Sequence, residues 1–105
     1  MTDLSSFQDL YLKTAKENIQ AIKDGISDLT NQSGNRKDIE QIHRNAHTLK
    51  SKSIIMGLSD IGDTAKAIED IFYDIKNQKQ QVSKELIDSV LQKIAVLDNA
   101  IVNII

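Results

Sequence analysis

IEQIHRNAHTLKSKSIIMG, from Ile39 to Gly57, is the stretch from which the fold is most directly predicted. Its apolar and small residues recur at alternating steps of three and four, as in the buried seam of a bundle helix. Gly57 predicts the end of this helix, because glycine enters the left-handed cap conformation without steric cost. We therefore predict a helix over residues 37–56. The seam consists of Ile39, Ile42, Ala46, Leu49, Ser53 and Met56.

Three other stretches show the same periodicity and predict helices over residues 6–29, 59–76 and 83–104. Ser5 with Gln8, Ser59 and Ser83 are the expected N-terminal caps. Polar turns are expected at 30–35 and 77–81. Four apolar stripes with short connections predict an all-α, antiparallel up-down-up-down four-helix bundle. The expected core residues outside the first seam are Phe7, Tyr11, Leu12, Ala15, Ile19, Ile22, Ile26, Leu29, Ile61, Ala65, Ile68, Phe72, Ile75, Leu86, Ile87, Val90, Leu91, Ile94, Leu97, Ile101 and Ile104.

Length and composition agree with this prediction. The 105 residues contain no proline and 4 glycines, 40% are hydrophobic and 27% are charged. This composition favours uninterrupted helices and one domain spanning 1–105. Since no apolar run approaches about 18 residues and the N-terminus resembles no secretion signal, we expect a cytoplasmic protein without a membrane segment.

The charge and the chemical inventory exclude several classes of function. A net charge of -2 argues against a nucleic-acid surface, and the absence of cysteine excludes a thiolate metal site. The scattered glycines form no loop that could cradle a nucleotide phosphate. We therefore expect no cofactor, and either a protein partner or none.

His47 is the residue that points to chemistry. It adjoins the buried seam at Ala46, so its ring is expected at the boundary between core and solvent, with Lys50 one turn further on the same flank. A neutral imidazole offers one ring nitrogen as a nucleophile, and the ammonium group of Lys50 can offset charge on a transferring phosphoryl group. This arrangement suits phosphoryl acceptance.

Glu69 is the predicted partner of the other ring nitrogen. His47 lies 10 residues before Gly57 and Glu69 lies 12 after it. In an antiparallel hairpin with a rise of about 1.5 Å per residue, the two residues fall within roughly 3 Å of the same height. Glu69 can therefore reach one nitrogen of His47 while the other faces solvent. The competing interpretation is a surface carboxylate that pairs with Lys66 or Lys76.

The stretch from Ala46 to Ser53, with Gly57-Leu58, resembles the histidine-containing phosphotransfer (HPt) domain, whose pattern is His-x-x-Lys-Gly, small residues and a later glycine. The resemblance covers nearly all of the chain. Within the family the chain is most similar to the N-terminal phosphotransfer domain of chemotaxis histidine kinases, because of the helix beginning at Phe7, the approach from Arg44 to His47, and Glu69. This similarity favours the interpretation that the chain is the N-terminal part of such a kinase over the interpretation that it is a free-standing carrier.

The resemblance implies that His47 is phosphorylated, Lys50 is its charge partner and Glu69 its hydrogen-bond acceptor. The donor would be an ATP-dependent histidine kinase domain, and the recipient an aspartate of a response-regulator receiver domain. The chain would then be a phosphorelay carrier in two-component signalling and not an enzyme. The residues expected at the docking surface for these partners are His43, Ser51, Ser53, Gly57 and Lys66.

The chain also departs from the family pattern. Ser51 stands where the family has glycine, Lys52 follows where a small residue is usual, and Lys66 replaces a second histidine of the chemotaxis kinases. The alternative function is therefore a helical interaction module that has lost the chemistry. A metal site formed by His43 and His47, four residues apart, is a third and weaker alternative, because no third ligand is evident and Lys50 would repel the ion.

Overall fold

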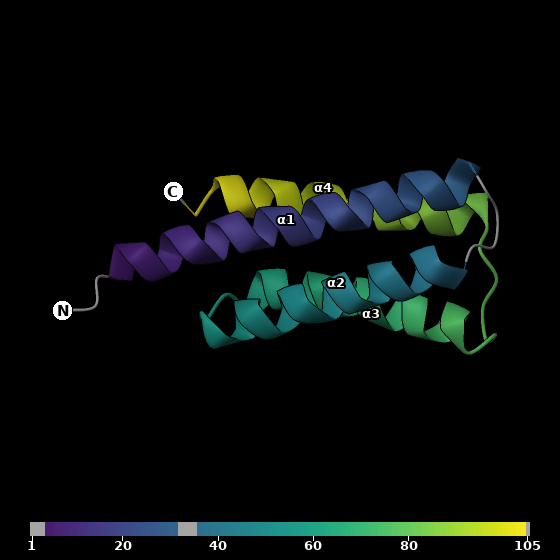
Figure 1. Cartoon of the computed structure of the whole chain (residues 1–105), viewed down its shortest axis with the longest axis horizontal. Helices are drawn as coiled ribbons and strands as arrows, with labels where there is room; N and C mark the ends of the chain where they lie inside the picture. Colours follow the sequence, from purple (N-terminus) through teal and green to yellow (C-terminus); the bar gives the residue numbers. More distant parts are fainter. Residues whose placement is uncertain (1–3, 32–35, 105) are drawn as a thin grey trace.

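The computed structural model describes residues 4–31 and 36–104, and in this part of the chain it contains four helices and no strand (Figure 1). Consecutive helices run antiparallel, so the all-α bundle that the sequence predicts is confirmed. The bundle measures 48 × 21 × 20 Å. The helices are α1 (Leu4–Asn31), α2 (Arg36–Ile55), α3 (Ser59–Lys76) and α4 (Lys84–Val102).

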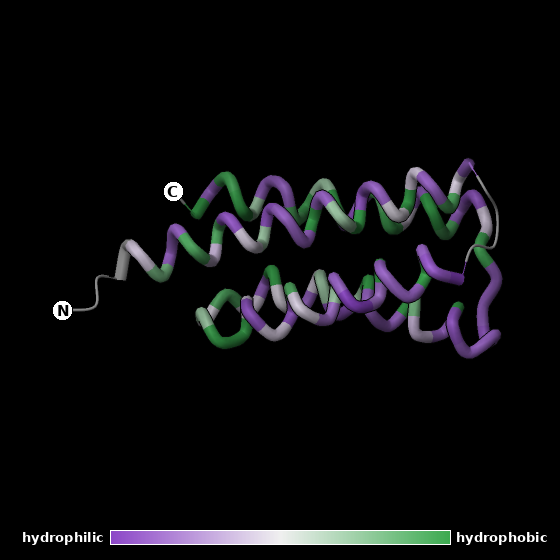
Figure 2. Tube along the Cα trace, viewed as in Figure 1, coloured by the Kyte–Doolittle hydropathy of each residue, from purple (hydrophilic) through white to green (hydrophobic). Residues whose placement is uncertain are grey.

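The core lies between the α1–α4 layer and the α2–α3 layer (Figure 1). Apolar positions alternate with polar ones along every helix, as the colours of Figure 2 show. Most of the predicted seam residues are buried. In the seam of α2, Met56 is exposed and the other five residues are buried. Burial of one such side chain stabilises the fold by about 1.5–3 kcal/mol.

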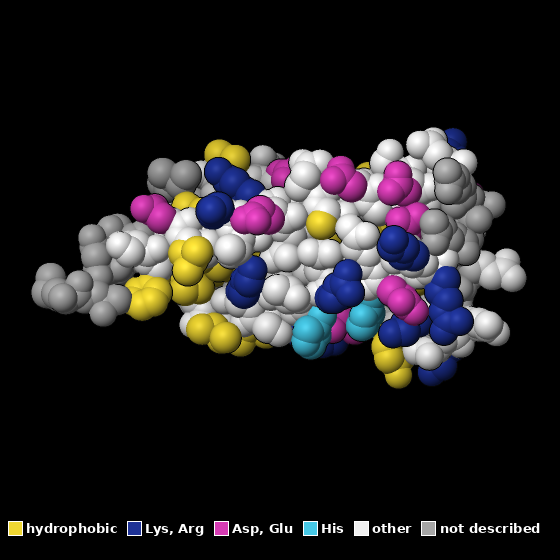
Figure 3. All heavy atoms as spheres, viewed as in Figure 1, with side chains coloured by type: hydrophobic (Ala, Val, Ile, Leu, Met, Phe, Trp, Pro, Cys, Tyr) yellow, Lys and Arg dark blue, Asp and Glu magenta, His cyan; other side chains and the backbone are white. Residues whose placement is uncertain are grey.

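Three residues predicted for the core are exposed. Phe7 is 51% exposed because the first turns of α1 extend past the ends of α2 and α3 (Figure 1). Met56 lies beyond the last residue of α2, and Leu91 faces outward from α4. Phe7 and Met56 belong to a group of exposed apolar side chains at this end of the bundle (Figure 3), where a shallow groove is lined mainly by α1 and α2.

The helix ends match the predicted signals in part. Gly57 has a φ of 77°, as its predicted capping role requires, and the Leu58 N–H donates to the Ser53 carbonyl at 2.8 Å. Ser83 caps α4, since its Oγ accepts from the Leu86 N–H at 3.2 Å. The prediction of a Ser59 cap is wrong, because Ser59 is already helical and Leu58 occupies the cap position without a side-chain bond.

The N-terminal half of the first hairpin also differs from the prediction. The capping box at Ser5 is wrong, because α1 already begins at Leu4. Thr30 and Asn31, expected in the first turn, continue α1, and the Thr30 hydroxyl donates to the Ile26 carbonyl at 2.8 Å. The rest of that predicted turn, 32–35, lies outside the described residues.

Small residues let α2 and α3 approach closely where the predicted site lies. Ala46 and Ala65 are fully buried, and a Cβ added at Gly62 would lie 3.1 Å from a side-chain carbon of Ile54. A glycine at this position therefore sets the spacing of the two helices. The close approach brings a side chain as short as glutamate on α3 within reach of α2. None of the helices in the described residues has the length and apolarity needed to cross a membrane.

Candidate functional site

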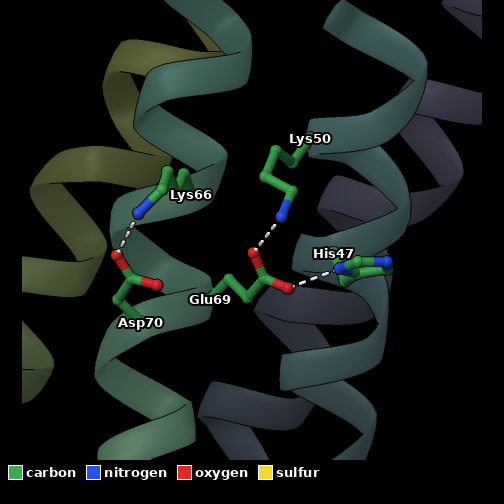
Figure 4. Close-up of polar contacts among 5 residues, drawn as sticks. All are labelled: His47, Lys50, Lys66, Glu69 and Asp70. Atoms are coloured by element: carbon green, nitrogen blue, oxygen red, sulfur yellow. Dashed lines mark hydrogen bonds and ion pairs between the residues drawn. The ribbon is translucent and has the colours of Figure 1, made fainter.

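His47 and Glu69 meet across the interface of α2 and α3. The His47 Nδ1 and Glu69 Oε2 atoms lie 2.5 Å apart (Figure 4). The His47 side chain is 56% exposed, whereas that of Glu69 is only 11% exposed. The predicted contact, with the ring at the solvent boundary, is therefore present.

Lys50 completes the cluster from one turn further along α2. Its Nζ lies 2.8 Å from Glu69 Oε1, so each carboxylate oxygen has its own partner (Figure 4). The interpretation of Glu69 as a surface charge that pairs with Lys66 or Lys76 is wrong. The Lys50 ammonium points at Glu69 on the α3 side, and its expected role beside a phosphoryl group stays a prediction.

The contact with Glu69 fixes the protonation of the neutral His47 ring. An ionised carboxylate only accepts hydrogen bonds, so Nδ1 must carry the ring proton. Nε2 then keeps its lone pair, and Figure 4 shows it on the side of the ring that faces away from Glu69 and α3. A carboxylate that selects the tautomer and the orientation of an imidazole leaves the exposed nitrogen ready to act as a nucleophile.

The charge of Glu69 is maintained by its partners. Burial by itself raises the pKa of the Glu69 carboxyl, but the hydrogen bonds and positive charges of Lys50 and His47 outweigh burial. The pKa therefore lies below its ordinary value of 4.5. Glu69 is ionised at neutral pH and keeps its role as an acceptor.

Two further predicted residues flank the cluster without joining it. Lys66 pairs with Asp70 at 2.8 Å on the surface of α3 (Figure 4), and this hydrogen bond raises the pKa of Lys66. His43 lies one turn before His47 with its ring centroid 6.1 Å from that of Tyr73. Burial lowers the pKa of the His43 imidazole, so this ring is uncharged at neutral pH.

The residues predicted for partner docking separate into two groups. Ser53 cannot take part, because it is fully buried and its Oγ lies 2.7 Å from the Tyr11 hydroxyl. The docking prediction for Ser53 is wrong because Ser53 occupies a seam position, and seam positions face the core. His43, Ser51, Gly57 and Lys66 all retain accessible surface, and their docking role stays a prediction.

A polar network on the opposite flank of α2 was not foreseen from the sequence. Asn18 donates to Asn45 Oδ1 at 2.9 Å, and Lys52 donates to Asn18 Oδ1 at 3.1 Å. Lys52, the departure from the family pattern, therefore lies against α1 and away from Glu69. Asn45 and Lys52 are seven residues apart on one face of α2, and this spacing is the signal that could have indicated a shared partner.

Within the described residues no three His, Cys, Asp or Glu side chains gather as metal ligands would. Both histidines lie on the face shown in Figure 3, with basic side chains beside them. The cluster is thus suited to hold a nucleophilic imidazole next to positive charge. This is what acceptance of a phosphoryl group requires.

Comparison with known proteins gives a family and several relatives. The Hpt domain family model matches residues 6–102. The chemotaxis protein CheA of Listeria monocytogenes is 31% identical over 80 residues, which are 76% of this chain and 13% of that protein. CheA of Bacillus subtilis is 24% identical over 103 residues, 98% of this chain and 15% of that protein. The chain thus spans only a small part of the length of these relatives.

Solved structures show the same fold. The CheA phosphotransferase domain from Thermotoga maritima superposes with a TM-score of 0.92, at 19% identity, over 98% of both chains. A protein with a redesigned hydrophobic core superposes with a TM-score of 0.83, at 22% identity, over 94% of this chain and 88% of that one. At this level of identity the two structures establish the fold alone.

Proposed function

Because the chain belongs to the Hpt domain family, we propose that it is a phosphoryl carrier of two-component signalling whose acceptor atom is Nε2 of His47. The observation that carries the proposal is the contact between His47 Nδ1 and the buried Glu69 carboxylate. In the neutral ring this contact leaves the lone pair on Nε2, on the side of the ring that faces away from Glu69. The domain is a carrier and not a catalyst, because the phosphoryl group resides on its own side chain.

The proposed loading step is a displacement at phosphorus. The lone pair of Nε2 attacks the γ-phosphorus of ATP held by a histidine kinase domain, a P–N bond forms, and the bond from phosphorus to the ADP oxygen breaks. The ring gains positive charge as the P–N bond forms. Glu69 stabilises this charge through the Nδ1 proton, which stays on the ring.

The unloading step returns the site to its starting state. A carboxylate oxygen of a receiver-domain aspartate attacks the phosphorus, the P–N bond breaks, and its electron pair returns to Nε2. No proton needs to leave the ring in either step, since Nδ1 keeps its hydrogen throughout. The likeness to the CheA proteins supports a chemotaxis-type kinase domain as the donor.

Labelling with ATP tests this function directly. The chain is incubated with the kinase domain of a CheA-type protein and γ-labelled ATP, and in parallel with the small donor phosphoramidate. We expect a phosphate that is lost in acid, is stable in base and is absent from His47→Gln. His43→Gln is the matched control, since His43 lies one turn away and bonds to no carboxylate among the described residues, and it should label normally with phosphoramidate, which needs no docking surface.

Two results would contradict the proposal. The first is labelling of His47→Gln at the wild-type rate. The second is failure of the folded wild-type chain to accept a phosphoryl group from either donor. The second result would favour the helical interaction module that lacks the chemistry.

A further inference from the structure

Lys50, the cation nearest to His47 on the α3 side, is already engaged. Its Nζ lies 2.8 Å from Glu69 Oε1, and the Lys50 side chain is only 21% exposed. Figure 4 shows this ammonium on the α3 side, whereas Nε2 of His47 points the other way. Phosphoryl oxygens that arrive at Nε2 therefore lie on the side of the ring away from this ammonium.

Helix geometry places a second cation on the free side of the ring. At about 100° per residue, the residue three positions after His47 lies roughly 60° to one side of it around the helix, and the residue three positions before lies roughly 60° to the other. The first is Lys50, which faces α3. The second is Arg44, which this geometry places on the side of His47 opposite Lys50. Figure 4 shows Nε2 pointing away from the Lys50 side.

Arg44 is free to bind an anion. Its side chain is exposed, and it makes no hydrogen bond or ion pair within residues 4–31 and 36–104. Side chains on a helix lean toward its N-terminus, so the His47 ring covers the turn that carries Arg44. A guanidinium group presents a fork of N–H donors that matches two oxygens of a phosphoryl group.

Ser51 adds a hydroxyl group further along α2, on the same angular side of His47 as Arg44. It lies one turn after His47 on the same face, and its hydroxyl makes no hydrogen bond to any described residue. Three threonines of this chain behave differently, since Thr14, Thr30 and Thr64 each donate to the carbonyl four residues before. The hydroxyl at 51, where the family pattern has glycine, is thus available as a donor.

We propose that Arg44 is the residue that binds the phosphoryl oxygens at Nε2 of His47, with the Ser51 hydroxyl as a second donor. This inference rests on the proposed function and assigns a role within it. Lys50 then acts through Glu69, whereas Arg44 touches the group that is transferred. Arg44 neither gives nor takes a proton; its charge stabilises the oxygens while the P–N bond forms and breaks.

The test measures the charge around the phosphoryl group of the phosphorylated chain. The chain is phosphorylated with phosphoramidate, and the ³¹P chemical shift of phosphorylated His47 is followed against pH. A guanidinium in contact lowers the pKa of the phosphoryl group, because it favours the dianion. We expect Arg44→Gln to move the midpoint to higher pH, Arg44→Lys to give an intermediate value and Ser51→Ala to give a smaller upward shift.

The rate of labelling gives a second readout. Loss of a charge-assisted hydrogen bond of about 1.5–3 kcal/mol corresponds to a tenfold to hundredfold slower transfer, which we expect for Arg44→Gln. Lys52→Gln is the matched control, because Lys52 is a cation of the same helix that bonds to Asn18 instead. It should change neither the midpoint nor the rate.

The outcomes separate the two proposals. A phosphorylated His47 whose midpoint is the same in wild type and Arg44→Gln would overturn the role of Arg44 and leave the carrier function intact. Failure of the folded wild type to accept phosphate would overturn the carrier function itself. Circular dichroism of each variant verifies that the bundle is folded.

Discussion

Two ion pairs that involve carboxylates of α3 have the same length but differ in how far they are exposed to solvent. The Lys50–Glu69 and Lys66–Asp70 ion pairs both measure 2.8 Å. The Glu69 side chain is 11% exposed and also bonds to His47. The Lys66 and Asp70 side chains are each more than half exposed and, among the described residues, bond only to one another. The comparison shows that distance alone does not identify a functional pair.

Burial and the number of partners separate the two contacts. Exposed pairs four residues apart on a helix are screened by water and contribute little. A buried carboxylate must keep its partners, because an unpaired charge away from water is costly. Glu69 therefore fixes the orientation of the His47 and Lys50 side chains of α2, whereas the Lys66–Asp70 pair is a solvated contact on the surface of α3.

The largest expected effect comes from removing the charge of the buried carboxylate. Glu69→Gln loses a hydrogen bond between charged groups of about 1.5–3 kcal/mol, and its amide can donate to Nδ1 and so favour the wrong tautomer. We expect labelling of His47 to slow by tenfold to hundredfold. Asp70→Asn is the matched change at the exposed pair and should label at the wild-type rate. Equal rates for the two variants would remove the proposed role of Glu69.

The second effect is on stability. Lys50→Gln leaves Oε1 of the buried Glu69 without its ionic partner, and we expect a loss of about 1 kcal/mol in the free energy of unfolding, or several degrees in Tm. Lys66→Gln should leave Tm unchanged, because both members of that pair are solvated. Thermal melts followed by circular dichroism compare the two variants. A larger loss for Lys66→Gln would reverse the ranking of the two contacts.

The third effect depends on pH. The folded-state pKa of Glu69 lies below 4.5, so its ionised form stabilises the fold. This contribution is complete above about pH 4.5 and is lost as the pH falls through the lower folded-state pKa. Denaturant melts should therefore show a stability difference between wild type and Glu69→Gln that is constant near neutral pH and shrinks in acid. A difference that grows in acid would contradict the assigned direction.

The smallest effect is expected when the whole exposed pair is removed. The Lys66→Gln/Asp70→Asn double variant keeps the net charge of the pair at zero and touches neither His47 nor Glu69. Its rate of labelling by phosphoramidate, which needs no docking surface, and its Tm should both match those of the wild type. A tenfold loss of labelling would show that Lys66, which replaces a second histidine of the chemotaxis kinases, takes part in the transfer.

The fold could be predicted because its determinants are local and periodic. The spacing of Ile42, Ala46 and Leu49 requires only that one face of a helix be buried, and all three are fully buried. Helix ends were less predictable, since Ser59 has the residue type of a cap but is already helical. Phe7 fits the stripe of α1, yet periodicity does not tell how far one helix extends past its neighbours.

The sequence predicted which residues of α2 and α3 lie at the same height along the hairpin, and this was enough to pair His47 with Glu69. Similar distances from Gly57, 10 residues for His47 and 12 for Glu69, placed the two residues opposite each other, and the structure brings them together. The height argument could not tell which way the Lys50 ammonium turns, because a lysine side chain can reach either a phosphoryl group or a neighbouring carboxylate. The partners of Lys52 on α1 depend on packing between helices, which the pattern of one helix does not contain.

The most direct test of the central claim is the state of the two nitrogens of the His47 ring. Long-range ¹H–¹⁵N NMR of the labelled chain distinguishes a protonated from an unprotonated or phosphorylated ring nitrogen. We predict that the neutral form of the ring carries its proton on Nδ1 before the reaction and that the phosphoryl group is on Nε2 after it. A neutral ring with its proton on Nε2, or a phosphoryl group on Nδ1, would contradict the proposal.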